Sequence, residues 1–382
     1  MTTLASKLPK IGTTIFTVMT RLADEHRAIN LSQGFPEFDP PAALLEHVAH
    51  YLRQSCHQYA PMPGAVSLRA AVAAKLADSY GVTADPDRQI TITSGATEAL
   101  FCTIQALVRA GDEVVVFDPC YDSYEPSVTL AGGRVVHLPL ALADFAIDWD
   151  RLRSALNART RLVIVNSPHN PSGALLARSD FARLAQMLRP YDCYVLSDEV
   201  YEHVVFDGAA HATALADPEL AARAIAVFSF GKTYHATGWK LGYCVASPAV
   251  TAEIRRVHQY VTFASTSPLQ YALADFLAQH PEHHRELPQF YQGLRDRFAA
   301  RLAGTRLKFE RARGTYFQLA DYGAISDLPD VEFARWLTIE HGVAVIPISV
   351  FYERPPDTRL VRFCFAKQPA TLDAAVRRLE RL

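Results

Sequence analysis

The stretch AIAVFSFGKTYHATGWKLGYCVAS, residues 224–247, contains two short apolar runs joined by a segment that carries two lysines. Short apolar runs bounded by turn residues are typical of buried β-strands. Lysine is rarely buried without a partner, because removing an ammonium group from water is costly. Lys232 and Lys240 are therefore either solvated loop residues or charges that meet a ligand at the end of a strand.

Similar apolar runs recur from about residue 90 to residue 246, and helical patterns such as ATEALFCTIQALVRAG (96–111) separate several of them. Strands that alternate with helices predict an α/β fold, with a mostly parallel sheet covered by helices on both faces. In such a sheet, ligands bind at the carboxyl ends of the strands. The predicted strands are 89–93, 113–118, 133–140, 160–168, 193–199, 224–230 and 241–247.

The two ends of the chain differ from this pattern. The first 39 residues begin like a helix and lead into LSQGFPEFDPP, which is rich in turn formers, whereas long helical patterns and a few short strands follow residue 270. We expect a large domain over residues 40–272 and a smaller α+β domain built from residues 1–39 and 273–382.

Composition narrows the class of protein. The 382 residues are 49% hydrophobic and 20% charged, as in ordinary globular proteins, and the formal net charge is −2. Without a basic excess, nucleic acid and anionic membranes are poor partners. No signal-peptide pattern or bilayer-spanning run is found, and the six cysteines are scattered without a C-x-x-C pair, which favours reduced thiols over disulfides or a metal site. A cytoplasmic location is expected.

Polar residues follow the predicted strands. The turn TSGATEA (93–99) opens a helix, where free N–H groups suit a phosphate, although a plain capped turn is an equal alternative. Tyr121 is placed to stack on a flat ring or to pack locally. Asn166 and Asn170 surround a proline turn, where asparagine is also a common turn former. Asp198 directly follows a buried strand, so it either caps the next segment or meets a cation.

One ligand would use each of these residues once. Pyridoxal 5′-phosphate has a phosphate for the turn at 94–97, a flat ring for Tyr121 and a pyridinium nitrogen for Asp198. Its phenolate oxygen suits Asn170 and Tyr201, and its aldehyde bonds the amine of one lysine. Lys232 would then be bonded to the cofactor and Lys240 would meet the phosphate.

Several longer stretches point the same way, and their order and spacing are specific. They are NLSQGFPEFDPP, QYAPMPGAVSLR, TSGATEALF, FDPCYDSYEP, NSPHNPSG, SDEVYEH, SFGKTYHATGWKLGY and VRFCFAK. Through them the chain resembles the class I/II aminotransferases of fold type I over essentially its whole length. The nearest subgroup contains the kynurenine, glutamine and methionine aminotransferases, and the bacterial methionine enzymes are the most similar in these stretches.

The resemblance implies a role for each matching residue. The catalytic residues that it implies are Lys232, which would hold the cofactor, Asp198 at the pyridinium nitrogen, and Tyr201 at the phenolate oxygen. The other implied cofactor contacts are Asn170, Tyr121, Ala96, Thr97, Ser229, Lys240 and, on the phosphate of the neighbouring subunit, Tyr59. The implied substrate contacts are Arg362 for the α-carboxylate, the Gly34 backbone, Asn166, Phe16 and, in the site of the neighbouring subunit, Phe263.

The resemblance further implies a homodimer with shared active sites that transfers an amino group from an amino acid to a 2-oxo acid. Phe16, Tyr121 and Phe263, without an obvious second arginine, predict large apolar or aromatic amino donors, with methionine favoured. Two positions depart from related enzymes. Lys240 stands where many aminotransferases have arginine, and Ala264 stands where kynurenine-type enzymes tend to have histidine, which argues against kynurenine as the main substrate.

Three alternatives are distinguishable. A carbon–sulfur β-lyase would use the same lysine but would eliminate a leaving group from the β-carbon. A non-catalytic binding protein on the same fold is disfavoured because no basic DNA-binding extension is found. A nicotinamide dehydrogenase is disfavoured because the chain lacks G-x-G-x-x-G.

Overall fold

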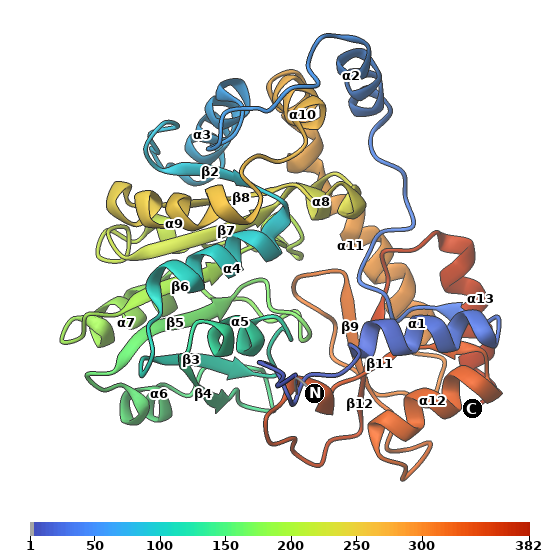
Figure 1. The fold of residues 1–382 in the computed structure, drawn as a ribbon. Coiled ribbons are helices and arrows are strands. Elements are labelled where there is room, and N and C mark those ends of the chain that lie inside the picture. Colours follow the sequence, from blue (N-terminus) through green and yellow to red (C-terminus); the bar gives the residue numbers. More distant parts are fainter. Residues whose placement is uncertain (1–3) are drawn as a thin grey trace.

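A seven-stranded sheet forms the centre of the predicted large domain in the computed structural model, which describes residues 4–382 (Figure 1). The strand order is β2-β8-β7-β6-β5-β3-β4. The strands are β2 (Ile90–Thr93), β3 (Glu113–Asp118), β4 (Arg134–Pro139), β5 (Thr160–Asn166), β6 (Tyr194–Asp198), β7 (Ala224–Ser229) and β8 (Gly242–Ala246). Strand β8 is antiparallel to β2 and β7, and the other pairings are parallel. The predicted strands and the mostly parallel sheet are confirmed.

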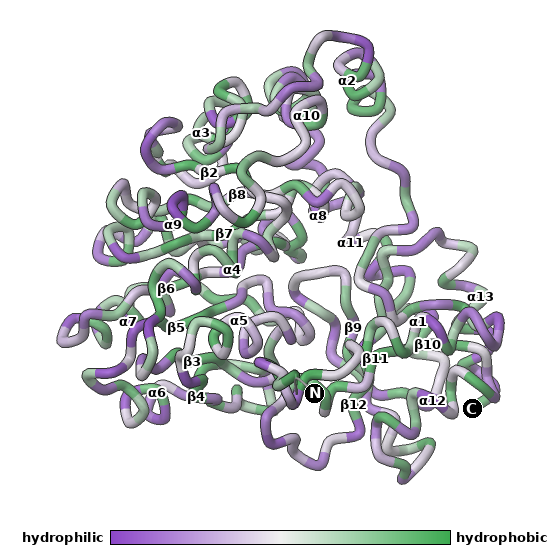
Figure 2. The backbone as a smooth tube through the Cα atoms, in the orientation of Figure 1, coloured by the Kyte–Doolittle hydropathy of each residue, from purple (hydrophilic) through white to green (hydrophobic). Residues whose placement is uncertain are grey.

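Helices cover both faces of this sheet because successive side chains of a strand point to opposite faces. Val114 and Val116 of β3 pack with one layer, whereas Val115 and Phe117 pack with the other. The first layer comprises α4 (Gly95–Leu107), α5 (Tyr124–Leu130) and α9 (Pro248–Val261). The second layer includes α3 (Val66–Tyr80), α6 (Trp149–Ala155), α7 (Arg178–Leu188), α8 (Phe230–Thr233) and α10 (Ser267–Gln279). Figure 2 shows hydrophobic residues along the central strands, as burial on both faces requires.

The two ends of the chain meet beside the large domain (Figure 1). Strand β1 (Ile29–Asn30) pairs in parallel with β10 (Val343–Ala344). A second sheet contains β9 (Phe317–Asp321), β11 (Ile346–Pro347) and β12 (Leu360–Cys364). Its strand order is β11-β12-β9, and both pairings are antiparallel. The helices of this region are α1 (Ile15–Glu25), α11 (Glu282–Leu302), α12 (Asp330–Glu340) and α13 (Pro369–Leu379), together with the short helical turn η3 (Ser349–Phe351). Two further helical turns, η1 (Ala214–Ala216) and η2 (Thr237–Trp239), lie beside the seven-stranded sheet.

The predicted domain boundary falls inside a helix. Helix α10 continues through residues 272 and 273, and its Phe276 and Leu277 pack in the core of the large domain. This helix lies against α2 (Ala42–Arg53) and α3, so residues beyond 272 still pack beside elements of the predicted large domain. Residues 1–3 of the predicted small domain lie outside the described residues, and the rest of the division stays a prediction.

Two further expectations concern cysteines and membranes. Cys56 is partly buried, the other five cysteines are buried, and all six are free thiols. Within residues 4–382, every helix is too short or too polar to span a bilayer.

Candidate active site

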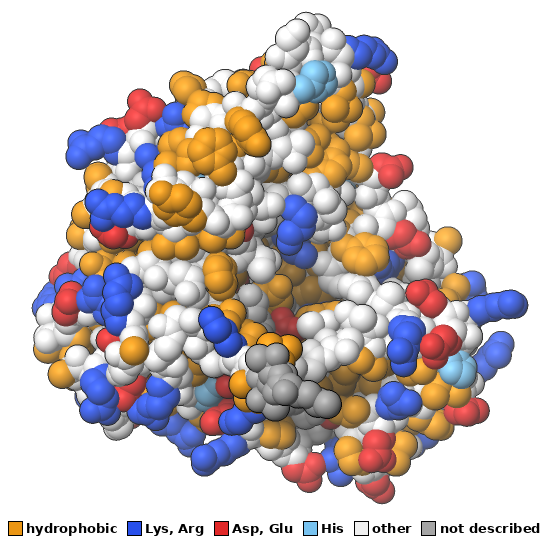
Figure 3. Space-filling model, viewed as in Figure 1, with side chains coloured by type: hydrophobic (Ala, Val, Ile, Leu, Met, Phe, Trp, Pro, Cys, Tyr) orange, Lys and Arg blue, Asp and Glu red, His pale blue; other side chains and the backbone are white. Residues whose placement is uncertain are grey.

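A cavity of about 300 Å³ lies between the carboxyl edge of the large sheet and the terminal region. Figure 3 shows the surface hollowed between these two regions. The volume is at the lower end of the range for small-molecule sites. The predicted site residues that line it are Phe16, Gly34, Ala96, Thr97, Tyr121, Asn166, Asn170, Asp198, Tyr201, Ser229, Lys232, Lys240 and Arg362.

Lys232 lies in α8, directly after β7, and its amine points into the cavity. Its Nζ donates a hydrogen bond of 2.9 Å to the backbone oxygen of Gly34 and lies 5.6 Å from the centre of the Tyr201 ring. Removal from water lowers the pKa of Lys232 to about 8, an effect that Arg362 and Lys240 reinforce. A substantial fraction of this amine is therefore neutral near physiological pH.

Asp198 is the last residue of β6 and is almost completely buried. The hydroxyl of Tyr124 donates to its Oδ2 at 2.7 Å. Burial raises the pKa of Asp198 to about 6, although the hydrogen bond from Tyr124 opposes this shift. The carboxylate is thus ionised at neutral pH but would gain strongly from a nearby cation.

The turn after β2 forms a concave end of the cavity. Gly95 begins α4 at φ +74°, and a Cβ there would lie 3.5 Å from Nζ of Lys240. At Gly242 a Cβ would lie 2.8 Å from the backbone nitrogen of Ala96, so a larger residue cannot fit. Helix N-terminal N–H groups and a lysine together favour an anion at this end.

Arg362 forms the opposite wall, on β12, and is fully buried. Its Nη1 donates to Oδ1 of Asn170 at 2.8 Å, and its Nη2 donates to the backbone oxygen of Ser32 at 3.0 Å. Its guanidinium carbon lies 3.9 Å from the ring centre of Phe317. Within residues 4–382 no carboxylate pairs with this guanidinium, and its Nε has no hydrogen-bond partner. A buried cation of this kind is suited to a carboxylate ligand.

The asparagines connect the two walls. Asn166 donates through Nδ2 to the backbone oxygen of Asp198 at 2.8 Å, and its Oδ1 accepts from the backbone nitrogen of Asn170 at 2.7 Å. Asn170 in turn accepts from Arg362. A continuous hydrogen-bonded path therefore runs from the sheet edge to the terminal region.

Two predicted residues, Tyr59 and Phe263, are not among the residues that line this cavity. Their side chains are 82% and 43% exposed, and their ring centres are 5.4 Å apart in an edge-to-face arrangement. Exposure leaves both rings accessible to another subunit, and their predicted place in a neighbouring site stays a prediction.

Three aromatic residues that contact the site residues were missed from the sequence, and of these Phe317 lines the cavity. Tyr124 bonds Asp198, the Tyr316 hydroxyl donates to the oxygen of Gly34 at 2.8 Å, and Phe317 stacks on Arg362. Tyr124 follows Tyr121 by three residues, at the start of α5, and this nearness in sequence was a usable signal. Tyr316 directly precedes β9 and Phe317 begins it, and no local sequence pattern predicted this strand.

Comparisons with known proteins agree with this geometry. A family model described as aminotransferase class I and II matches residues 26–379. The chain is 54% identical to the methionine aminotransferase of Escherichia coli, across 99% of this chain and 98% of that protein. It is 33% identical to human kynurenine–oxoglutarate transaminase 3, across 97% of this chain and 88% of that protein.

Solved structures give the same answer. The structure of YbdL from Escherichia coli, described as having a methionine aminotransferase function, matches with a TM-score of 0.98 and 53% identity across 100% of both chains. The N-succinyldiaminopimelate aminotransferase of Mycobacterium tuberculosis matches with a TM-score of 0.95 and 38% identity, across 99% of this chain and 100% of that one. With the fold, the polar sheet edge and these full-length matches in agreement, the chain belongs to the class I and II aminotransferase family.

Proposed function

We propose that this aminotransferase moves the amino group of a large apolar or aromatic amino acid, methionine first, to a 2-oxo acid. The observation that carries the proposal is the placement of Lys232, Asp198 and Arg362 around one cavity. The 54% identity to a methionine aminotransferase supports the choice of methionine.

Aminotransferases of this family use pyridoxal 5′-phosphate, and the residues present fit it. The glycine-lined turn leaves room for a phosphate, which Ala96, Thr97, Ser229 and Lys240 would hold. Around the ring, the residues that would contact the cofactor are Tyr121 at its face, Asn170 and Tyr201 at the phenolate oxygen, and Asp198 at the ring nitrogen. When bound, the cofactor supplies an electron-withdrawing ring that stabilises negative charge at the α-carbon of the amino acid.

Lys232 would move the proton. Because burial lowers its pKa to about 8, its Nζ can be neutral in the working pH range and accept the proton from the α-carbon. The same nitrogen would then deliver the proton to the cofactor carbon attached to the substrate nitrogen, so one residue would serve as base and acid. Asp198 would hold a proton on the cofactor's ring nitrogen, since a buried carboxylate is stabilised by an adjacent positive charge.

Arg362 would select and orient the substrate. Its guanidinium binds the α-carboxylate by charge-assisted hydrogen bonds, and Asn170 and Phe317 hold the guanidinium plane in place. The Gly34 backbone and Asn166 lie beside it in the cavity and would assist. A fixed carboxylate fixes the direction of the α-hydrogen.

The preference for apolar substrate side chains follows from the cations that line the cavity. The cations among the described lining residues are Lys232, Lys240 and Arg362, and each already has a role, so none is left for a side-chain carboxylate. The rings of Phe16, Tyr121 and Phe317 offer apolar contact instead. Large apolar side chains should therefore react faster than acidic ones.

A homodimer completes the proposal. Tyr59 would reach the phosphate of the neighbouring subunit, and Phe263 would enter its side-chain pocket, which agrees with their exposure. The predicted cytoplasmic location stays a prediction.

The decisive experiment is an absorbance titration of the cofactor-loaded protein with single amino acids. Methionine should shift the visible band, and aspartate should do so far more slowly. A faster response to aspartate would overturn the substrate assignment, and no response to any amino acid would overturn the function. Release of pyruvate from cystathionine without an added oxo acid would support the β-lyase instead.

A further inference from the structure

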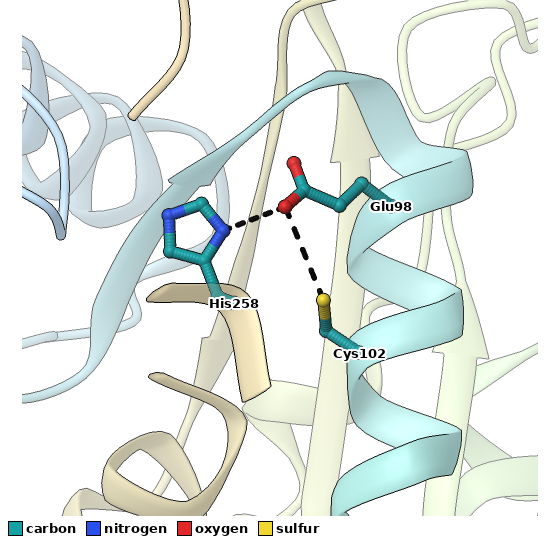
Figure 4. Close-up of side chains that lie close together, drawn as sticks. All are labelled: Glu98, Cys102 and His258. Atoms are coloured by element: carbon teal, nitrogen blue, oxygen red, sulfur yellow. Dashed lines mark hydrogen bonds and ion pairs between the residues drawn. The ribbon is translucent and has the colours of Figure 1, made fainter. Parts of the chain in front are cut away.

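A buried pair, Glu98 and His258, lies behind the phosphate-facing turn and has no part in the proposed reaction steps. Glu98 is in the first turn of α4, and His258 is in the last turn of α9 (Figure 4). Nδ1 of His258 lies 2.7 Å from Oε1 of Glu98, and its Nε2 lies 3.0 Å from the backbone oxygen of Met62. The histidine side chain is completely buried.

Both ring nitrogens of His258 face an oxygen that only accepts hydrogen bonds. A neutral imidazole carries one N–H and can satisfy only one of these oxygens, whereas an imidazolium donates to both. Burial raises the pKa of Glu98, but the hydrogen bonds from His258 and the Ser94 backbone more than offset this effect. The pKa of Glu98 therefore falls below its ordinary value, and the carboxylate is ionised at neutral pH. The geometry therefore assigns a positive His258 to a negative Glu98.

A metal site at this position is the competing explanation. Sγ of Cys102 lies 4.0 Å from Oε1 of Glu98, which brings three ligand types together (Figure 4). Burial raises the pKa of Cys102 far above neutrality, so the sulfur is a thiol and a weak ligand. Nε2 of His258 is occupied by the Met62 oxygen, and Nδ1 by Glu98 itself. These contacts favour a hydrogen-bonded ion pair.

The pair connects three segments. Oε2 of Glu98 accepts from the backbone nitrogen of Ser94, in the turn that faces the phosphate site. The Met62 oxygen lies three residues after Tyr59. The backbone oxygen of His258 accepts from the nitrogen of Phe263 at 3.1 Å, and the Phe263 ring packs on Tyr59. The two exposed rings are thus tied to the phosphate turn of their own subunit through one residue, His258: its imidazole contacts the segment that follows Tyr59, and its backbone oxygen holds the nitrogen of Phe263.

We propose that His258, as the charged partner of Glu98, is a positioning residue that holds Tyr59 and Phe263 where they complete the active site of the neighbouring subunit. The inference rests on the proposed function, because it assumes that Tyr59 contacts the phosphate across the dimer.

The test compares the cofactor dissociation constant of the native protein with those of four variants: Tyr59→Phe, His258→Phe, the double variant and Cys102→Ala. Each of the first two should weaken binding about tenfold, the worth of one hydrogen bond to a charged group. The double variant should be no weaker than the worse single variant, because both changes remove the same contact. Cys102→Ala should bind like the native protein.

Additive losses in the double variant would show that His258 acts independently of Tyr59 and would overturn the inference. A large loss in Cys102→Ala would favour the metal site and overturn it too. Native protein that binds no cofactor would instead overturn the proposed function.

A second readout needs no bound cofactor. Nitrogen-15 spectra of histidine-labelled apo protein at pH 7 should show a buried ring with both nitrogens protonated whose signature is lost in Glu98→Gln. This variant keeps the shape of the side chain, so it serves even where His258→Phe fails to fold. A neutral ring at His258 in the native protein would overturn the inference.

Discussion

The two walls of the cavity treat buried charge in opposite ways. At the sheet edge, burial moves the pKa of Lys232 down to about 8 and that of Asp198 up to about 6, so both groups approach neutrality. On the terminal wall, burial also lowers the pKa of Arg362, but a guanidinium stays charged, and Phe317 and Asn170 hold it in one orientation. One wall is therefore suited to moving protons and the other to fixing a carboxylate, and the two should respond differently to substitution.

The largest effect is expected at the proton-moving wall. Lys232→Ala should reduce turnover by at least about 10⁴-fold, because the other lysine that lines the cavity, Lys240, lies beside Gly95 at the turn after β2. Cofactor affinity should change much less, since the phosphate and ring contacts remain. Steady-state rates and a cofactor titration check both statements, with the exposed Lys308→Ala as the matched control. Near-native turnover in Lys232→Ala would show that Lys232 does not move the proton and that the two walls do not differ in this way.

Substitution at the carboxylate-fixing wall should affect substrate binding more than the chemical step. Arg362→Lys should raise KM for amino acids on the order of 100-fold, because a point charge cannot replace a planar pair of donors. The variant should also discriminate less between an amino acid and the amine that lacks its carboxylate. Arg335→Lys, an exposed change on α12, is the control. An unchanged KM would show that another residue binds the carboxylate.

Asp198 allows a test of stability against pH. Its raised pKa means that the folded protein binds a proton more tightly than the unfolded chain between pH 3.8 and about 6, so stability falls as pH rises through this window. Apo Asp198→Asn lacks this penalty and should be more stable than native apo protein by about 1–3 kcal/mol at pH 8. The advantage should disappear near pH 4. Urea unfolding at both pH values measures it, and equal midpoints at pH 8 would contradict the assignment.

The smallest effect should come from Tyr124. Tyr124→Phe removes the hydrogen bond to Asp198 and should lower kcat/KM about tenfold, while KM for the amino acid stays close to native. Tyr260→Phe, which removes an exposed hydroxyl, provides the control. A change confined to KM would show that Tyr124 acts in substrate binding, as the carboxylate-fixing wall does.

The sheet edge was largely predictable from sequence, and the terminal wall was predictable only through family resemblance. Lys232 and Asp198 each follow an apolar strand directly, so a local pattern marks them and the topology brings them together. Arg362 lies on a strand whose neighbours are β9 and β11, and no pattern in VRFCFAK shows that its side chain faces Phe317. Tyr316 joins Gly34 across 282 residues, a contact that only the packed fold creates.

The hydrogen bond from Arg362 to Ser32 joins residues separated by 330 positions. A nascent polypeptide emerging from the ribosome can therefore complete its central sheet and polar edge well before the substrate-recognising side exists. The substrate-recognising wall can form only after Arg362, near the end of the chain, has been synthesised and has reached Ser32, near its beginning.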